Sequence, residues 1–243
     1  MNKKIVVSLS VVVVVAAIAV GATTAFFSDT ETSTGNTFTA GAIDLQIDST
    51  ASYNGEPVVA ATWQLKDLNP TSDKFFNFAD IKPGDEGENT ISLHVINNDA
   101  WVCAEVLNLT NADNGCTEPE SDPTSGNDTT CGTPGAGEGE LQNAMVWTVW
   151  RDNGASDNSC NNVLDGDETV LVSGQPVNGV LPVYDSTTST GALAGGSTAC
   201  LGVSWELPLA TGNEVQTDSL TGDISFNVVQ SRNNTDFQCI PQE

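Results

Sequence analysis

Apolar residues recur at every second position in several segments of this chain, and this pattern constrains the fold more than any other feature. In segment 201–207 the apolar residues occupy every second position: Leu201, Val203, Trp205 and Leu207. A period of two places these side chains on one face of a β-strand, whereas a helix requires a period near 3.6. The same alternation recurs at 42–48, 90–96 and 223–229. Each segment is predicted to be a strand with one face in a core and the other in water.

Turn-forming residues separate these segments. In segment 81–89, IKPGDEGEN, Pro83 and Gly84 are adjacent, and this arrangement favours a tight turn. No segment shows convincing helical spacing. We therefore expect an all-β protein, a jelly-roll-like sandwich of two antiparallel sheets, in which residues 41–243 form a single domain.

Two long polar insertions are expected to interrupt the strands, at about 110–142 and 151–168. The first contains almost nothing that a core could bury, so a disulfide would be needed to hold it compact. The second concentrates carboxylates among glycine and asparagine residues: Asp152, Asp157, Asp165, Asp167 and Glu168. Because Ca²⁺ prefers oxygen donors on such loops, these five residues are candidate calcium ligands.

The spacing of these carboxylates does not match an EF-hand. When the glycine of that motif is aligned on Gly166, the closing glutamate position falls on Val172. A solvated acidic loop is the alternative interpretation. No cofactor other than calcium is predicted.

Six cysteines, none in a Cys-x-x-Cys pair, indicate disulfides in an exported protein: Cys103, Cys116, Cys131, Cys160, Cys200 and Cys239. We expect three disulfides, and their connectivity stays open because six cysteines allow fifteen pairings. The pair that closes the shortest polar loop is Cys116 with Cys131.

Residues 1–25 are typical of an export signal. Lys3 and Lys4 precede a run of apolar or small residues at 5–20, and further small residues follow. This run is shorter than the ~20 apolar residues that cross a bilayer. Cleavage is expected after Ala25, so the mature chain would begin at Phe26. An uncleaved membrane anchor is the alternative.

The charge of the chain restricts its partners. Residues 1–25 contain two of the seven basic residues and no acidic residue, so the mature chain would carry a formal charge of −27. Such a charge argues against nucleic acid and anionic membranes as partners, and it predicts a response to divalent cations. Contact with a membrane is expected only through the signal before cleavage.

The sequence predicts no catalytic site. His94 is the one histidine, whereas a zinc site normally combines several nitrogen or sulfur ligands. A His-Glu-x-x-His motif is therefore impossible, and neither a Gly-x-Ser-x-Gly elbow nor a phosphate-binding loop is present. The chain is not expected to be an enzyme, and His94 is expected on the polar face of its strand.

The segment after the expected cleavage site resembles the start of the TasA and camelysin family of exported proteins, which are processed by a SipW-type signal peptidase. In the family an aromatic residue and an aspartate follow the cleavage site, and here these are Phe27 and Asp29. A Thr-Phe-x-x-Gly motif then leads into a strand, and here it is formed by Thr37, Phe38 and Gly41 before the strand residues 43–45. Segments 79–106 and 204–234 are similar to the family's Lys-Pro-Gly-Asp turn and its C-terminal strand pair. The middle of the chain, with both acidic insertions, departs from the family, and nothing is carried over there.

The resemblance implies a secreted structural subunit of biofilm-matrix fibres that assemble by donor-strand exchange. The N-terminal segment 26–40 of one subunit would complete the sheet of the next, through the donor residues Phe26, Phe27, Asp29, Thr37 and Phe38. The implied partners are copies of the chain, the signal peptidase and other matrix proteins, in the extracellular matrix or at the cell surface. Three alternatives stay open: a donor segment that pairs within its own subunit, a camelysin-type cell-surface metallopeptidase, and a monomeric, calcium-tuned adhesin.

Overall fold

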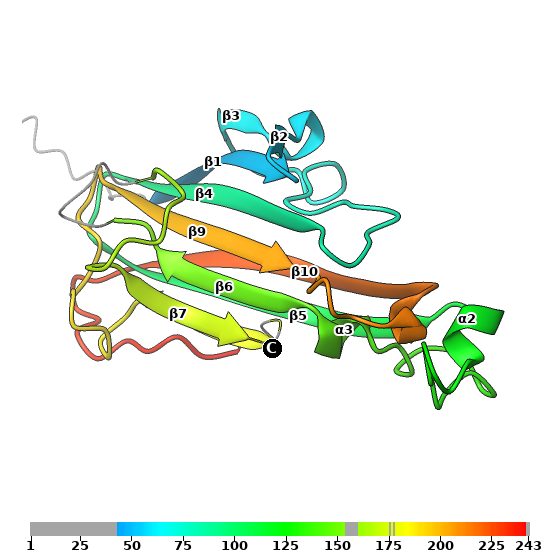
Figure 1. Cartoon of the computed structure of the whole chain (residues 1–243). Coiled ribbons are helices and arrows are strands. Elements are labelled where there is room, and N and C mark those ends of the chain that lie inside the picture. Colours follow the sequence, from blue (N-terminus) through cyan, green and yellow to red (C-terminus); the bar gives the residue numbers. More distant parts are fainter. Residues whose placement is uncertain (1–42, 154–159, 175, 177, 242–243) are drawn as a thin grey trace, which may run out of the picture. The chain divides into compact units, whose positions relative to one another are not determined.

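Two antiparallel sheets make up the protein in the computed structural model, which describes residues 43–153, 160–174, 176 and 178–241 (Figure 1). The larger sheet has seven strands: β1 (Asp44–Tyr53), β2 (Glu56–Pro57), β3 (Trp63–Lys66), β4 (Glu86–Ile96), β6 (Val146–Arg151), β7 (Thr169–Gly174) and β9 (Thr198–Glu206). The smaller sheet has three: β5 (Ala100–Asp113), β8 (Gly179–Tyr184) and β10 (Asp218–Gln230). The predicted all-β sandwich of two antiparallel sheets is confirmed.

The chain crosses repeatedly between the two sheets. The larger sheet has the order β2-β1-β4-β9-β6-β7, with β3 also on β1, and the smaller has the order β10-β5-β8. The successive strands β4 and β5 therefore lie in different sheets, and so do β9 and β10. As a result β4 pairs with β9 in one sheet while β5 pairs with β10 in the other. These pairings join parts of the chain that are far apart in sequence.

Short helices occur in the connections, where the sequence predicted none. They are η1 (Val59–Ala61), α2 (Glu118–Ser121), α3 (Leu141–Ala144) and η2 (Asn213–Val215). Each has at most four residues, too few to show a period of 3.6 in the sequence. Helix α2 begins with a capping box between Thr117 and Glu120. Within the described residues, no helix has the length and apolar character needed to cross a membrane.

The main core lies between the sheets and is built by the alternating apolar residues. Leu93 of β4 and Val102 of β5 are fully buried, and Leu201 and Val203 of β9 join them. The predicted inward face of segment 201–207 is therefore confirmed.

A second apolar cluster surrounds Trp205 at one end of the larger sheet. Trp205 is 3% exposed, and its ring centroid lies 5.2 Å from that of Phe78 and 6.0 Å from that of Tyr53. Gly87 is directly opposite Trp205 in the β4–β9 pairing. A Cβ atom at position 87 would overlap the indole, so glycine is required for this close approach.

Asp85 fastens the predicted turn at 82–85 to the end of β1. One carboxylate oxygen accepts hydrogen bonds from the Tyr53 hydroxyl and from the Lys82 backbone N–H at 2.7 Å, and the other accepts one from Asn54 Nδ2 at 2.9 Å. Burial alone would raise the pKa of Asp85, but these hydrogen bonds hold it below its usual value. Burial, followed by the hydrogen bond to Asp85 and the charge of that carboxylate, raises the pKa of Tyr53 to about 12.

The lowered pKa of Asp85 predicts a stabilisation that depends on pH. A carboxyl group whose pKa is lower in the folded state stabilises the protein above its unfolded pKa, and this contribution disappears as the pH falls through the folded pKa. Asp85→Asn is therefore expected to lower the free energy of unfolding by about 1 kcal/mol at pH 7, and the difference should shrink below about pH 4. Urea unfolding at pH 7 and pH 2.5 measures this, with the exposed Asp67→Asn as control. A loss of equal size at both pH values would contradict the interpretation.

Candidate functional site

Strand β10 is the edge of the smaller sheet. Along Asp218–Gln230 it pairs with β5 on one side, and no described strand pairs with its other side. The register shifts once, between Thr221 and Asp223, and it is regular from there to Gln230. An open strand edge presents unpaired N–H and C=O groups to any further strand. We call the segment 224–230 the β10 edge.

Apolar side chains accompany the β10 edge. Ile224, Phe226 and Val228 pack against the core but remain only partly buried. The ring of Phe226 meets Phe75 edge-on at a centroid distance of 5.8 Å, and Phe75 in turn lies 5.1 Å from the ring of Trp63. An added strand could therefore bury apolar surface as well as satisfy backbone groups.

The β10 edge lacks the usual protection against strand addition. Natural edge strands are commonly blocked by lysine, proline or charged residues that point inward. Segment 224–230, ISFNVVQ, contains no charged residue and no proline. The edge is thus chemically suited to pair with another strand.

The residues predicted to act as the donor lie outside the described residues. These are Phe26, Phe27, Asp29, Thr37 and Phe38, together with the cleavage site at Ala25 and Phe26. Their roles stay predictions.

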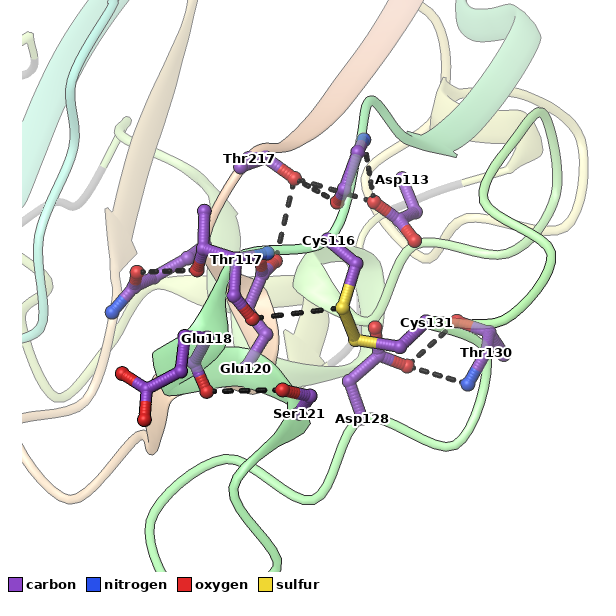
Figure 2. Close-up of a disulfide and its surroundings, with 12 residues drawn as sticks. Asp113, Cys116, Thr117, Glu118, Glu120, Ser121, Asp128, Thr130, Cys131 and Thr217 are labelled. Atoms are coloured by element: carbon purple, nitrogen blue, oxygen red, sulfur yellow. Dashed lines mark hydrogen bonds between the residues drawn. A yellow bond between two sulfur atoms is a disulfide. The ribbon is translucent and has the colours of Figure 1, made fainter.

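The predicted three disulfides are confirmed, and they join Cys103 to Cys239, Cys116 to Cys131, and Cys160 to Cys200. No cysteine is free. The short-loop pair Cys116–Cys131 was the pair that the sequence favoured, and it closes the first insertion (Figure 2). The other two disulfides connect strands of the sandwich to distant segments, and the sequence left these pairings open.

Asp152, predicted as a calcium ligand, organises the backbone of the second insertion. Its side chain is fully buried, and its oxygens accept hydrogen bonds from the backbone N–H groups of Cys160 at 3.1 Å and Asn162 at 2.7 Å. The Cys160–Cys200 disulfide ties the same turn to β9. Both oxygens of Asp152 are thereby engaged by the protein itself.

The other predicted calcium ligands of the second insertion are only partly brought together. Glu168 accepts a hydrogen bond from the Asp165 backbone N–H at 2.9 Å, and one carboxylate oxygen of Asp165 is buried without a partner. Asp167 has an interaction of its own, and Asp157 lies outside the described residues. Calcium binding by the second insertion stays a prediction.

The first insertion is more ordered than its polar composition suggested. Its residues 135–137 run beside the end of β5, where Asp113 N–H donates to Gly135 O at 3.1 Å and Gly137 N–H donates to Asn111 O at 2.9 Å. Glu120 is fully buried and accepts hydrogen bonds from the Thr117 backbone N–H and from the Thr217 hydroxyl (Figure 2). Polar contacts therefore replace the apolar core that the sequence lacks in this segment.

Carboxyl groups that the sequence analysis did not single out gather at the base of this insertion: Asp113, Asp128, Glu140 and Asp218. Burial, and next the nearby charges of Asp128 and Asp218, raise the pKa of Glu140 to about 7. Burial also raises the pKa of Asp218. In the sequence these residues are scattered, and only the pairing of β5 with β10 brings Asp113 opposite Asp218.

In the described part of the chain, one group of potential metal ligands has its ligand atoms within 4.8 Å of one another, namely Cys116, Asp128 and Cys131. The two cysteines form a disulfide, so neither sulfur is a thiolate that could bind a metal. Asp128 alone is left of this group as a candidate ligand.

His94 is engaged at both ring nitrogens. Nε2 lies 2.6 Å from Asp48 Oδ2, and Nδ1 lies 3.0 Å from Thr198 Oγ1. The imidazole thus bridges the neighbouring strands β1 and β9 across the outer face of β4. This arrangement fits a structural role on the polar face of the strand, as the alternation predicted.

The described residues define an all-β sandwich with three disulfides and a strand edge that no described strand covers, in a strongly acidic chain. Residues 1–116 match the family model described as camelysin metallo-endopeptidase. The resemblance to the TasA and camelysin family is therefore confirmed over this part of the chain. No curated protein matches the chain.

Proposed function

We propose that this protein is an exported structural subunit that joins copies of itself into extracellular fibres by strand addition at the β10 edge. The observation that carries the proposal is the open, uncharged edge of β10 with its half-buried apolar side chains. The camelysin family match supports it, because that resemblance implies a donor segment directly after an export signal. The extracellular matrix or the cell surface is the proposed location.

Assembly has a physical basis because one donor segment can both pair with the backbone of the β10 edge and cover its apolar side chains. An extended donor supplies backbone hydrogen bonds to β10 and apolar side chains to the half-buried cluster beside it. Phe26, Phe27 and Phe38 are the proposed anchors, and each buried phenylalanine contributes roughly 1.5–3 kcal/mol. The proposed partners are further copies of the chain, a SipW-type signal peptidase that frees the donor, and other matrix proteins.

Removing the donor segment is expected to abolish fibres. Negative-stain electron microscopy should show regular fibres from the mature chain that begins at Phe26 and only monomers from a variant that lacks residues 26–38. A synthetic peptide of residues 26–38 should bind this truncated variant, and a scrambled peptide should not. Assembly should also increase with salt, since subunits of charge −27 repel each other and the Debye length falls from about 30 Å at 0.01 M to about 10 Å at 0.1 M.

Fibres from the truncated variant would show that another segment forms the joint. Monomers from both chains, at every salt concentration and with calcium, would favour the monomeric adhesin instead. In that case the donor segment would pair within its own subunit.

The family description favours one second candidate, a metallopeptidase. A zinc peptidase needs several ligands, and the single histidine is already bound between Asp48 and Thr198. Cleavage of casein by the pure protein, abolished by a chelator and restored by Zn²⁺, would support the peptidase. We propose the structural role because the described residues offer an assembly edge and no comparable set of zinc ligands.

A further inference from the structure

The base of the first insertion brings four carboxyl groups into a continuous chain of contacts. Asp113, at the end of β5, is directly opposite Asp218, at the start of β10. Asp218 Oδ2 accepts a hydrogen bond from the Glu140 backbone N–H at 2.6 Å. The Thr130 hydroxyl lies 2.7 Å from Asp128 Oδ1 and 3.5 Å from Glu140 Oε1. Two sheet residues and two loop residues are therefore neighbours, although no three of their carboxylate oxygens lie within 4.8 Å of one another.

Each of these carboxylates keeps one oxygen buried and without a hydrogen-bond partner, and the amide oxygen of Asn111 on β5 is in the same state. The five atoms are Asn111 Oδ1, Asp113 Oδ2, Asp128 Oδ2, Glu140 Oε2 and Asp218 Oδ1. Asp113 is only 3% exposed and Asp128 only 8%. A buried acceptor without a partner is strongly unfavourable, and more so when it is charged. Five such acceptors on neighbouring residues favour the binding of a positively charged ligand.

Asp113 and Asp128 are the two most buried carboxylates of the cluster. In each of them the other oxygen, Oδ1, accepts a backbone hydrogen bond that holds the side chain in place. Asp113 Oδ1 accepts a hydrogen bond from the Gly115 N–H at 2.9 Å, and Asp128 Oδ1 accepts one from the Thr130 N–H at 2.6 Å. The loop backbone thus fixes each carboxylate through one oxygen and leaves the other available. The Cys116–Cys131 disulfide closes the same loop beside Asp128 (Figure 2).

Among the residues that the structure describes, no ion pair joins a basic side chain to the cluster. The charges that act on Glu140 come from Asp128, Asp218 and Asp113. Those that act on Asp218 come from Asp113 and Glu120. The ion pairs found among the described residues join Lys66 to Asp73, Lys82 to Asp80 and His94 to Asp48, all outside the cluster. A positive ion is therefore the class of ligand that this charge favours.

We propose that Ca²⁺ binds at the base of the first insertion, through Asn111, Asp113, Asp128, Glu140 and Asp218. Calcium takes six to eight oxygen ligands in flexible geometry, so five protein oxygens leave room for water or a backbone carbonyl. A site with only oxygen donors disfavours zinc and copper. The ion would draw the pair Asp113–Asp218 and the pair Asp128–Glu140 onto one centre, an adjustment that calcium tolerates better than magnesium.

Calcium at this position would fasten the first insertion to the junction of β5 and β10. Asp113 and Asp218 belong to the sheet, whereas Asp128 and Glu140 belong to the insertion and its end. The proposal is independent of fibre assembly, because it concerns binding and stability of the single subunit. It also differs from the predicted calcium site in the second insertion.

The test uses the purified protein, freed of calcium by EGTA, in calorimetric titrations and thermal unfolding. At a calcium concentration about one hundred times the dissociation constant, the melting temperature is expected to rise by roughly 5–10 °C, with a smaller rise for magnesium. Asp113→Asn, Asp128→Asn and Glu140→Gln should each weaken calcium binding by about tenfold or more. In EGTA, Glu140→Gln should be at least as stable as the natural protein, because the substitution removes repulsion among the carboxylates.

Two matched variants serve as controls. Glu118→Gln makes the same chemical change as Glu140→Gln at an exposed position of the same insertion, and Asp165→Asn changes the second insertion. Glu118→Gln should bind calcium like the natural protein. Asp165→Asn should keep calcium binding at the cluster and can remove only the separate site predicted in the second insertion. The proposal is overturned if calcium neither binds nor stabilises, if the three cluster variants bind it unchanged, or if Asp165→Asn abolishes binding. Circular dichroism in EGTA identifies any variant that fails to fold. If Asp113→Asn, in a strand, does not fold, Asp128→Asn tests the proposal, because Asp128 lies in a loop.

Discussion

Replacing Cys103 and Cys239 with serine is expected to lower the free energy of unfolding by about 5 kcal/mol. This disulfide joins β5 to the C-terminal segment across a sequence separation of 136 residues. A cross-link that closes so long a loop removes much conformational entropy from the unfolded chain, which is the main source of its stabilising effect. The same segment is also held by the Cys239 N–H, which donates to Asp185 Oδ2 at 3.1 Å.

The matched comparison is the double variant Cys116→Ser/Cys131→Ser. That pair spans only 15 residues, so the expected loss is about 3 kcal/mol. Urea unfolding without reductant, followed by circular dichroism, measures both variants. Equal losses, or a larger loss for the short loop, would show that loop length does not decide the stabilisation here.

The second large effect is expected for Trp205→Ala, with a loss of about 3–5 kcal/mol. Trp205 is 3% exposed, stacks with Tyr53 and packs at a tilted angle against Phe78, next to the backbone of Gly87. Truncation to alanine would remove the centre of the second cluster and leave a cavity that the surrounding rings cannot fill. Thermal and urea unfolding should both report the loss.

Leu209→Ala is the control for this substitution. Leu209 lies four residues further along the chain and is 82% exposed, so its truncation should change the free energy of unfolding by less than about 0.5 kcal/mol. A small effect of Trp205→Ala would mean that the main core between the sheets suffices for stability. The two variants together therefore measure how far the end cluster contributes.

Much of the fold could be predicted because alternation is a local signal. The inward face of segment 201–207, most of which lies in β9, was predicted directly from Leu201, Val203, Trp205 and Leu207, and all four are buried. The four-residue helix α2 was missed because its capping box lies in a segment too short to show a period. The first insertion was expected to have almost nothing to bury, yet Glu120 is fully buried in a polar network.

The candidate sites were less predictable because they depend on which strands become neighbours. Six cysteines predicted three disulfides, but only the short pair could be favoured over the others. The carboxylates of the second insertion were chosen for their density in the sequence, whereas Asp152 proved to bind backbone N–H groups. The cluster at Asp113 and Asp218 has no local density and could not be found in this way.

The sequence by itself determined the class of the fold, the inward apolar positions of the alternating segments, the number of disulfides and the acidic charge, because these follow from local composition and period. Only the tertiary structure decided that β10 is an edge strand, that Asp113 meets Asp218, and that the first insertion closes over them. The physical reason is that strand pairing joins residues far apart in the chain. Each strand carries its own alternation, but that pattern does not specify its partner.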